Sequence, residues 1–310
     1  MWKYVLKRLV SIIPIMLGAM FIVFVIMDLA PGDATDLLLS TDSTDEERAE
    51  LRAQLGLDKP VPVQFINYVI NLCKGDLGTS YKSGASVISE LSQRMPYTFM
   101  LALAATIIKV VVSIPLGMLA AIKQNTVFDS ATMAVCLIGV SMPAFWLALM
   151  LILLFSVNLG WLPVSGSGSL KHLILPAMTQ SFNGLASIAR VTRSSMLEVV
   201  RQDYVRTARA KGLPEQVVIW KHSLKNALLP TVTVIGGSIA GLLAGGVLTE
   251  TVFAWPGIGR FLMNSISWRD TPCVMGCVMM FVIFFAVINL IVDILYGFID
   301  PRIKGMYVKK

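Results

Sequence analysis

The chain has 310 residues, of which 55% are hydrophobic and only 15% are charged, and its mean hydropathy is +0.72. This composition excludes an ordinary soluble domain and is typical of a protein that crosses a membrane several times. The net charge of +7 does not indicate nucleic-acid binding, because the cations gather in short loops beside apolar runs and no basic groove with interleaved aromatic residues is present.

A basic N-terminus precedes an apolar run from Leu9 to Ala30. The run is close to the roughly 20 residues that an α-helix needs to cross a bilayer. A cleaved signal peptide is the competing interpretation, but the run is longer than the roughly 7–15 apolar residues of such a peptide, and Pro31 directly after it makes a poor cleavage site. We therefore expect residues 1–30 to form a retained first transmembrane helix with its N-terminus in the cytoplasm.

The polar segment 31–94 is expected to form a small extracytoplasmic loop domain with short helices. Thr44 and Glu47 have the spacing of a capping box at a helix start, and Gly56 supplies the stop of that helix. Residues 63–73 make a second amphipathic run. This pattern predicts an ordered cap rather than a disordered linker.

The core, 95–310, contains five further apolar runs. They lie near 97–122, 131–157, 173–188, 229–248 and 274–299. Six spans would place both termini and the basic segment 190–228 in the cytoplasm, in agreement with the positive-inside rule. The expected fold class is thus an all-α polytopic membrane protein with six transmembrane helices.

Some polar side chains lie inside these apolar runs. The fourth run contains Gln180 and Asn183, and Lys109 lies near the middle of the second run. Such groups are costly against lipid, so we expect them to face a polar protein interior or a wet pathway. For Lys109, a position shifted toward the membrane interface by helix tilt is an open alternative.

The fifth run carries Gly237, Gly241 and Gly245 at four-residue spacing. Small residues at this spacing let two membrane helices approach closely. The motif does not say whether the partner helix belongs to this chain or to another subunit.

The basic segment between the fourth and fifth runs is the part of the chain that least resembles a simple loop. A helix is expected from Glu198 to a stop at Gly212, followed by a second helical run over 215–228. Bulky Tyr204 and Leu213, together with Trp220 further on, are expected to be exposed outside the bilayer. These features favour a surface that docks a protein partner, and the alternative is a basic loop lying on anionic lipid headgroups.

Within this segment, residues 203–213 read DYVRTARAKGL and residues 222–230 read HSLKNALLP. The two stretches resemble the "EAA" coupling loop of bacterial ABC importer permeases, in the form typical of the dipeptide/oligopeptide/nickel branch. The chain departs from the general motif in having Arg206 and Thr207 where Glu and Ala stand. The resemblance implies that ATPase coupling involves Asp203, Tyr204, Arg206, Thr207, Ala208, Arg209, Lys211, Gly212, Leu213 and His222.

The resemblance also implies a fold, a function and partners. It implies the type I ABC importer permease fold and an ATP-driven import of peptides across the bacterial inner membrane, with nickel or another small solute as the alternative cargo. The expected partners are a second homologous permease, two ABC ATPase subunits that carry ATP and Mg, an extracytoplasmic binding protein, and membrane lipid. Lys109, Gln180 and Asn183 are expected on the translocation pathway, and Gly237, Gly241 and Gly245 between the two permeases.

The sequence offers little for other chemistry. It contains no Gly-x4-Gly-Lys-Ser/Thr phosphate loop, and its two histidines, His172 and His222, fall on opposite sides of the membrane in the expected topology. The four cysteines have no neighbouring histidine that would complete a metal site, so neither an enzyme nor a metal or cofactor on this chain is expected. An ion-gradient-driven secondary transporter is the alternative from a different class, although few ionisable groups lie deep in the spans.

Overall fold

The computed structural model describes residues 2–32, 34–39 and 43–299, and this part of the chain consists of helices joined by loops, without a β-strand. The elements are α1 (Trp2–Leu29), α2 (Ala34–Leu38), α3 (Asp45–Leu55), α4 (Val61–Cys73), α5 (Val87–Ile122), α6 (Val127–Ser141), α7 (Ala144–Leu151), the π-helical η1 (Ile152–Asn158), α8 (Leu170–Val200), α9 (Asp203–Ala210), α10 (Glu215–Val217), the π-helical η2 (Val218–Leu224), α11 (Lys225–Val252), α12 (Ile258–Ser267) and α13 (Thr271–Ile299). The all-helical expectation is confirmed for the described residues.

Within the described residues, three helices are long and apolar enough to cross a membrane: Arg8–Leu29 in α1, all of α5, and Thr271–Ile294 in α13. The pair formed by α6 and by α7 with η1 passes the same test if it is taken as one bent span. The helices α8 and α11, with 31 and 28 residues, also exceed the roughly 20 residues that a bilayer requires. The chain is therefore a multi-pass membrane protein.

The third span, expected as one helix over 131–157, is broken. The helix α6 ends at Ser141, and α7 leaves it at an angle of 107°. Met142 has an extended backbone, with φ −78° and ψ 130°, and Pro143 follows it. The break arises because proline lacks a backbone N–H and disfavours the helical conformation of the residue before it.

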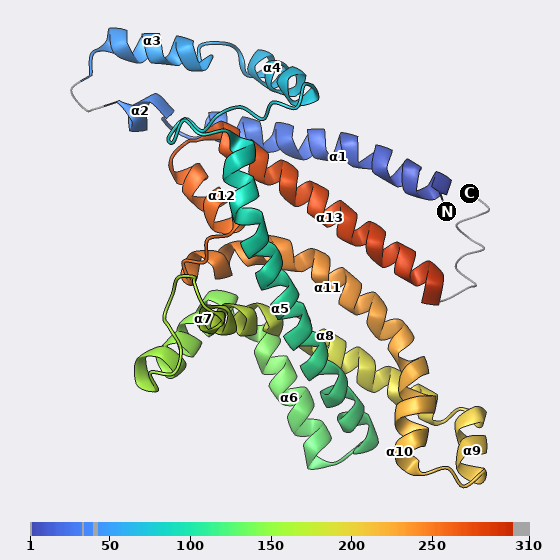
Figure 1. Ribbon diagram of the computed structural model, residues 1–310. Coiled ribbons are helices and arrows are strands. Elements are labelled where there is room, and N and C mark those ends of the chain that lie inside the picture. Colours follow the sequence, from blue (N-terminus) through green and yellow to red (C-terminus); the bar gives the residue numbers. More distant parts are fainter. Residues whose placement is uncertain (1, 33, 40–42, 300–310) are drawn as a thin grey trace.

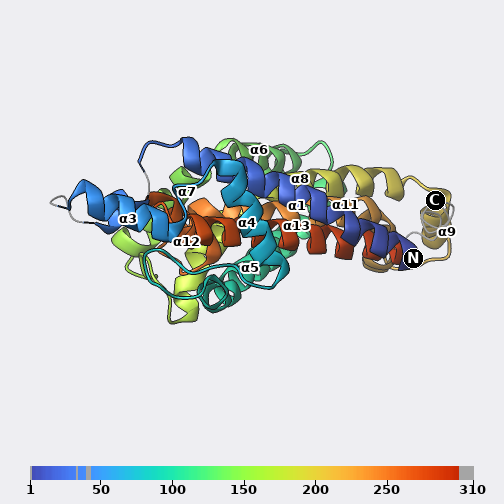
Figure 2. The ribbon, with the colours of Figure 1, turned by 90° about the horizontal axis from the view of Figure 1, so that it is seen from above.

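The core is built by α5, α8 and α11, which pack against one another. A Cβ atom on Gly117 of α5 would clash with the carbonyl of Ala189 of α8, and one on Gly236 of α11 would clash with Val292 of α13. Glycine at these two contacts lets the helix axes approach closely. The helices α1 and α13 lie side by side along one flank (Figures 1 and 2).

The short helices α2, α3 and α4 lie at one end of the molecule, here named the cap end, and α9 lies at the opposite end (Figure 1). The Trp2 end of α1 points toward the α9 end in both views (Figure 2). The capping box is confirmed: the Thr44 hydroxyl accepts from the Glu47 N–H at 3.2 Å, and the Glu47 carboxylate accepts from the Thr44 N–H at 2.9 Å. Gly56, with φ 70°, ends α3 as expected.

The second span begins earlier than expected. Instead of starting near Tyr97, α5 runs without interruption from Val87, so one helix crosses the boundary expected at 94/95. Pro96 is accommodated inside it. The part of α5 before Tyr97 ties the cap end directly to the core.

Candidate functional site

The basic segment 190–228 folds into two helices joined by a turn, but its first helix differs from the expectation. Glu198 belongs to α8, which continues to Val200, and a new helix, α9, starts at Asp203. Between them Gln202 is extended, with φ −72° and ψ 150°. The expected single helix from Glu198 is therefore wrong, and Asp203 instead occupies the first turn of α9, where a carboxylate stabilises the helix.

The glycine stop after α9 is confirmed. Gly212 has φ +75°, in the left-handed region, and its N–H donates to the Arg209 carbonyl at 2.9 Å. No atom lies within 4 Å of a Cβ built on Gly212. Backbone conformation rather than lack of space therefore favours glycine at this position.

A small apolar cluster holds α9 against η2. Val205 and Ala208 of α9 and Val218 of η2 are buried together. Ala208 is only 6% exposed, because it packs inside the element. The cluster makes α9, the Gly212 turn and η2 one unit, here named the coupling element (residues 203–224).

The remaining residues of the motif present a surface. Exposed positions are Asp203, Tyr204, Arg206, Thr207, Arg209, Lys211, Gly212 and Leu213, and His222 is half-buried. Tyr204 is 41% and Trp220 55% exposed. The Tyr204 hydroxyl accepts a hydrogen bond from the Asn226 side chain at 2.8 Å, which orients the ring. The surface thus combines exposed aromatic groups, one of them oriented by a hydrogen bond, with cations, and aromatic residues and arginine are enriched in protein interfaces.

One cation of this surface is already paired within the element. Arg209 donates from Nε and Nη2 to the two carboxylate oxygens of Glu215, at 3.1 and 2.6 Å, across the Gly212 turn. These hydrogen bonds from Arg209 lower the pKa of the Glu215 carboxyl and raise the pKa of Arg209. The pair bridges α9 and α10 and supports the turn.

A second charged pair joins α6 to α8 near this element. Arg193 of α8 donates from Nε and Nη2 to the two carboxylate oxygens of Asp129 of α6, each at 2.6 Å. Asp129 is buried and also accepts from the Asn125 N–H at 3.1 Å. This pairing was not predicted from the sequence, because Arg193 and Asp129 lie 64 positions apart.

Lys109 lies inside the protein. It is 1% exposed. A Cβ atom built on Gly184 of α8 would lie 3.3 Å from the Lys109 Nζ atom and 3.4 Å from the Cβ atom of Ser238 in α11. Lys109 is therefore enclosed by its own chain, and its depth relative to the membrane interface stays a prediction. Its ammonium has no hydrogen-bond partner among the described residues, and Gly184 has φ +95°, which marks a distortion of α8 beside it.

Gln180 lies one helical turn from this contact and is also buried. Its side-chain amide donates to the Leu242 carbonyl of α11 at 2.7 Å. The side chain of Asn183 lies outside the described residues. Lys109 and Gln180 are thus enclosed between α5, α8 and α11 in this conformation and do not face lipid.

The glycine stripe on α11 is open over its described part. Gly237 and Gly241 are exposed, and no atom of the described chain lies within 4 Å of a Cβ built on either one. The surroundings of Gly245 lie outside the described residues. The packing of α11 within the chain uses other glycines, including Gly236.

Sequence reasoning missed a buried acid at the cap end of α11. Glu250 is 1% exposed. Its carboxylate accepts from the Thr98 hydroxyl at 2.8 Å and from the Arg260 N–H at 3.1 Å, while the Thr98 hydroxyl accepts from the Ile258 N–H at 2.8 Å. The loop between α11 and α12 is thereby fixed onto α5.

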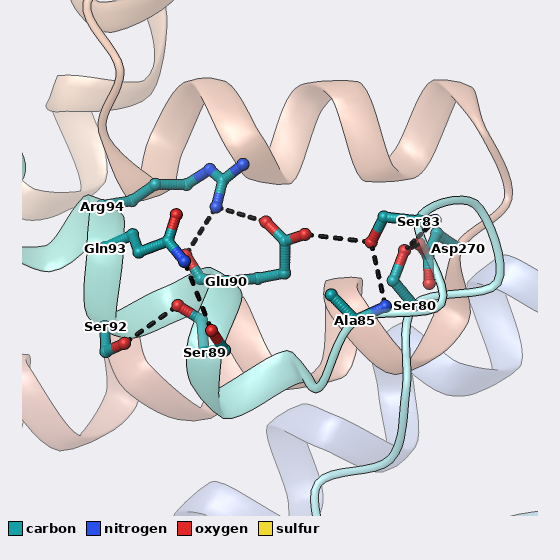
Figure 3. Close-up of polar contacts among 9 residues, drawn as sticks. All are labelled: Ser80, Ser83, Ala85, Ser89, Glu90, Ser92, Gln93, Arg94 and Asp270. Carbon is teal, nitrogen blue, oxygen red and sulfur yellow. Dashed lines mark hydrogen bonds and ion pairs between the residues drawn. The ribbon is translucent and has the colours of Figure 1, made fainter.

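A neighbouring polar network fixes the start of α5 (Figure 3). The Ser80 hydroxyl donates to Asp270 at 2.5 Å, and the Ser83 hydroxyl donates to Glu90 at 2.9 Å. Glu90 also pairs with Arg94, whose guanidinium lies 4.1 Å from the ring centre of Phe261 in α12. These contacts hold α5, α12 and the start of α13 together.

The comparisons with known sequences match the whole chain. Residues 113–305 match the family described as "Binding-protein-dependent transport system inner membrane component", and residues 1–102 match its N-terminal counterpart. A dipeptide transport system permease of Alkalihalophilus pseudofirmus is 41% identical over 98% of this chain and 100% of its own length. A di/tripeptide permease of Pseudomonas aeruginosa is 42% identical (98% and 99%), and a glutathione permease of Salmonella typhimurium is 41% identical (98% and 99%).

Solved structures support the fold. An inward-facing structure of the MetNI methionine ABC transporter matches with a TM-score of 0.57 and 19% identity, over 68% of this chain and 96% of that chain. An amino acid ABC transporter with bound histidines matches with a TM-score of 0.51 and 12% identity, over 67% and 94%. At these identities the likeness extends to the fold alone.

Proposed function

Because the chain belongs to the family of inner membrane components of binding-protein-dependent transport systems, we propose that it is the permease subunit of an ATP-driven ABC importer for peptides. Permeases named for dipeptides, di/tripeptides and glutathione resemble it along nearly its full length, and this supports a short peptide as the cargo. Nickel or another small solute is the competing cargo for the same mechanism.

The observation that carries the proposal is the coupling element. Its exposed aromatic and basic groups form a surface, and η2 continues without a loop into α11. The cluster of Val205, Ala208 and Val218 makes α9 and η2 move together. A force applied to α9 by an ATPase subunit would therefore pass into α11, which packs on α8 and α13.

The arrangement of the helices supports a topology of six spans with both termini in the cytoplasm. The Trp2 end of α1 and the coupling element lie at the same end of the molecule (Figure 1), and that end is the proposed cytoplasmic side. The cap end would then be extracytoplasmic and would meet the binding protein. The six spans would be α1, α5, the bent pair of α6 with α7, α8, α11 and α13.

A second, homologous permease would complete the pathway. Gly237 and Gly241 form an open strip of small residues on α11, and a helix of the partner permease would pack there. Lys109 and Gln180 are enclosed within this chain, so they would reach the pathway only in another conformation. ATP and Mg would be bound by two ATPase subunits.

The experiment is uptake of a radiolabelled dipeptide into proteoliposomes. They would contain this chain, the partner permease and the two ATPases, with the binding protein added outside. We expect uptake that requires both ATP and the binding protein. Uptake of Ni²⁺ in place of the dipeptide would establish the competing cargo, and uptake driven by a proton gradient without ATP would contradict the proposed mechanism.

A further inference from the structure

A cavity of about 500 Å³ opens where two membrane spans end. The apolar segment Arg8–Leu29 of α1 ends beside it, and the segment Thr271–Ile294 of α13 begins beside it. Two independent spans therefore place the cavity at the boundary between the hydrocarbon and headgroup layers. In Figure 1 the helices α2 and α3 lie beyond the ends of these two spans.

The lining of the cavity is amphipathic. Phe24, Met27 and Ala30 supply an apolar wall on the side of the α1 span. The charged residues of the lining are Asp28, Asp36, Arg48, Arg52 and Arg269. An apolar wall continuous with a membrane span, combined with charges of both signs, fits an amphiphile with a zwitterionic headgroup better than a uniformly polar solute.

Arg269 is held at the edge of this cavity by an unusual backbone. It has φ +54°, a left-handed conformation in which a Cβ atom is sterically unfavourable and which glycine adopts more readily. Its Nη2 donates to the Pro31 carbonyl at 2.8 Å. The loop between α12 and α13 thus has an arginine at a position where glycine would be less strained. Backbone strain of this kind is common at functional sites.

Asp28 is the complementary group. It is exposed on the last turn of α1, and its carboxylate has no hydrogen bond or ion pair with the described residues. A carboxylate at the end of an apolar span is costly unless water or a cation accompanies it. Asp28 and Arg269 therefore offer an acceptor for an ammonium group and a donor for a phosphate within one cavity.

We propose that this cavity binds a phospholipid whose headgroup carries both a phosphate and an ammonium group. The guanidinium groups of Arg269 and Arg52 bind the phosphate, since the planar fork of arginine matches phosphate oxygens. The Asp28 carboxylate accepts the ammonium group, and an acyl chain lies along Phe24 and Met27. The bound lipid anchors the cap helices to the membrane surface, a role independent of the transported solute.

The test uses the full chain, delipidated in detergent and titrated with one lipid at a time under native mass spectrometry. The probes are phosphatidylethanolamine and phosphatidylglycerol with identical acyl chains. We expect the wild-type chain to bind phosphatidylethanolamine about fivefold more tightly, as one solvent-accessible ion pair provides. Asp28→Asn should abolish that preference, and because Asp28 has no hydrogen-bond or ion-pair partner among the described residues, its replacement should leave the fold intact.

Further variants locate the phosphate and identify the source of the ligand. Arg269→Gln should weaken binding of both lipids, whereas Lys59→Gln, an exposed cap position outside the cavity, should change neither. Equal binding of the two lipids by the wild-type chain would overturn the proposal, as would an unchanged preference in Asp28→Asn. Displacement of the lipid by millimolar inorganic phosphate would show that the cavity takes a free anion and would also overturn it.

Discussion

At the cap end of α11, Glu250 is buried and its carboxylate joins α5 to the loop before α12 through several hydrogen bonds. At the other end, α11 continues through η2 into an exposed element that rests on three small apolar side chains and one partly exposed ion pair. The cap end of α11 is thus fixed by hydrogen bonds inside the chain, whereas the coupling element at the other end has few contacts with the rest of the chain. This difference fits the proposed function, in which an ATPase subunit would bind the coupling element while the cap end of α11 stays in place.

The largest expected effect comes from releasing the fixed end. Glu250→Ala leaves the Thr98 hydroxyl and the Arg260 N–H without their buried acceptor and opens space beside them. We expect the free energy of unfolding to fall by about 3 kcal/mol. Thermal unfolding of the purified permease measures this, with the exposed Glu198→Ala as the matched control. Equal melting temperatures for the two variants would contradict the fixed-point interpretation.

The Asp129–Arg193 pair tests whether the contact between α6 and α8, near the coupling element, is also rigid. Asp129→Ala leaves the guanidinium of a bidentate, largely buried pair without its acceptor, and we expect a loss of about 2 kcal/mol. A double-mutant cycle with Arg193→Ala should give a coupling energy above about 1 kcal/mol, because the two residues contact each other directly. Additive losses would mean that the pair contributes little and that α6 is held by apolar packing.

A smaller effect on stability but a large effect on transport is expected at Gly212. Gly212→Val imposes a β-branched side chain on a left-handed backbone, at a cost of about 1–2 kcal/mol, which is too little to unfold the protein. The variant should assemble with its partners but transport poorly, because α9 is reoriented.

Gly212→Asn should retain more transport, since asparagine tolerates this conformation. Gly18→Ala, at an open site in α1 without positive φ, is the control. Normal uptake by Gly212→Val with a full complement of ATPase would show that the conformation of the turn is not needed for coupling.

The smallest effect concerns the pair of Arg209 and Glu215. The pKa of Glu215 is lowered in the folded protein, so the pair stabilises the turn at pH values above the ordinary pKa of 4.5, and this contribution is lost as pH falls through the lowered value. Both groups are partly exposed, so the effect should stay below about 1 kcal/mol. Amide protection factors in α9 should fall in Glu215→Gln at pH 7, and the difference from wild type should shrink as pH falls below 4.5 through the lowered pKa. A difference that does not change with pH would exclude the ion pair as its cause.

Local signals in the sequence predicted the local structure well. The capping box at Thr44, the stop at Gly56 and the left-handed Gly212 each follow from residue types acting over a few positions. The apolar runs likewise located the main helices, because a bilayer sets their minimum length.

Longer-range features escaped prediction for a physical reason. The break at Pro143 could not be predicted from the proline alone, because membrane helices also tolerate internal prolines such as Pro115. The buried positions of Glu250 and Asp129 depend on partners more than 60 residues away. A sequence shows a charge and its depth along a helix, but not the face that the helix presents to its neighbours.

The most direct test of the central claim is site-specific photo-crosslinking in the assembled transporter. A photoreactive amino acid at Tyr204, on the coupling element, is compared with one at Trp161, a more exposed aromatic position (63%) outside that element. The account predicts a covalent adduct with an ATPase subunit from position 204, altered in yield by ATP, and none from position 161. Adducts from position 204 with lipid alone, under conditions in which the ATPase co-purifies, would contradict it.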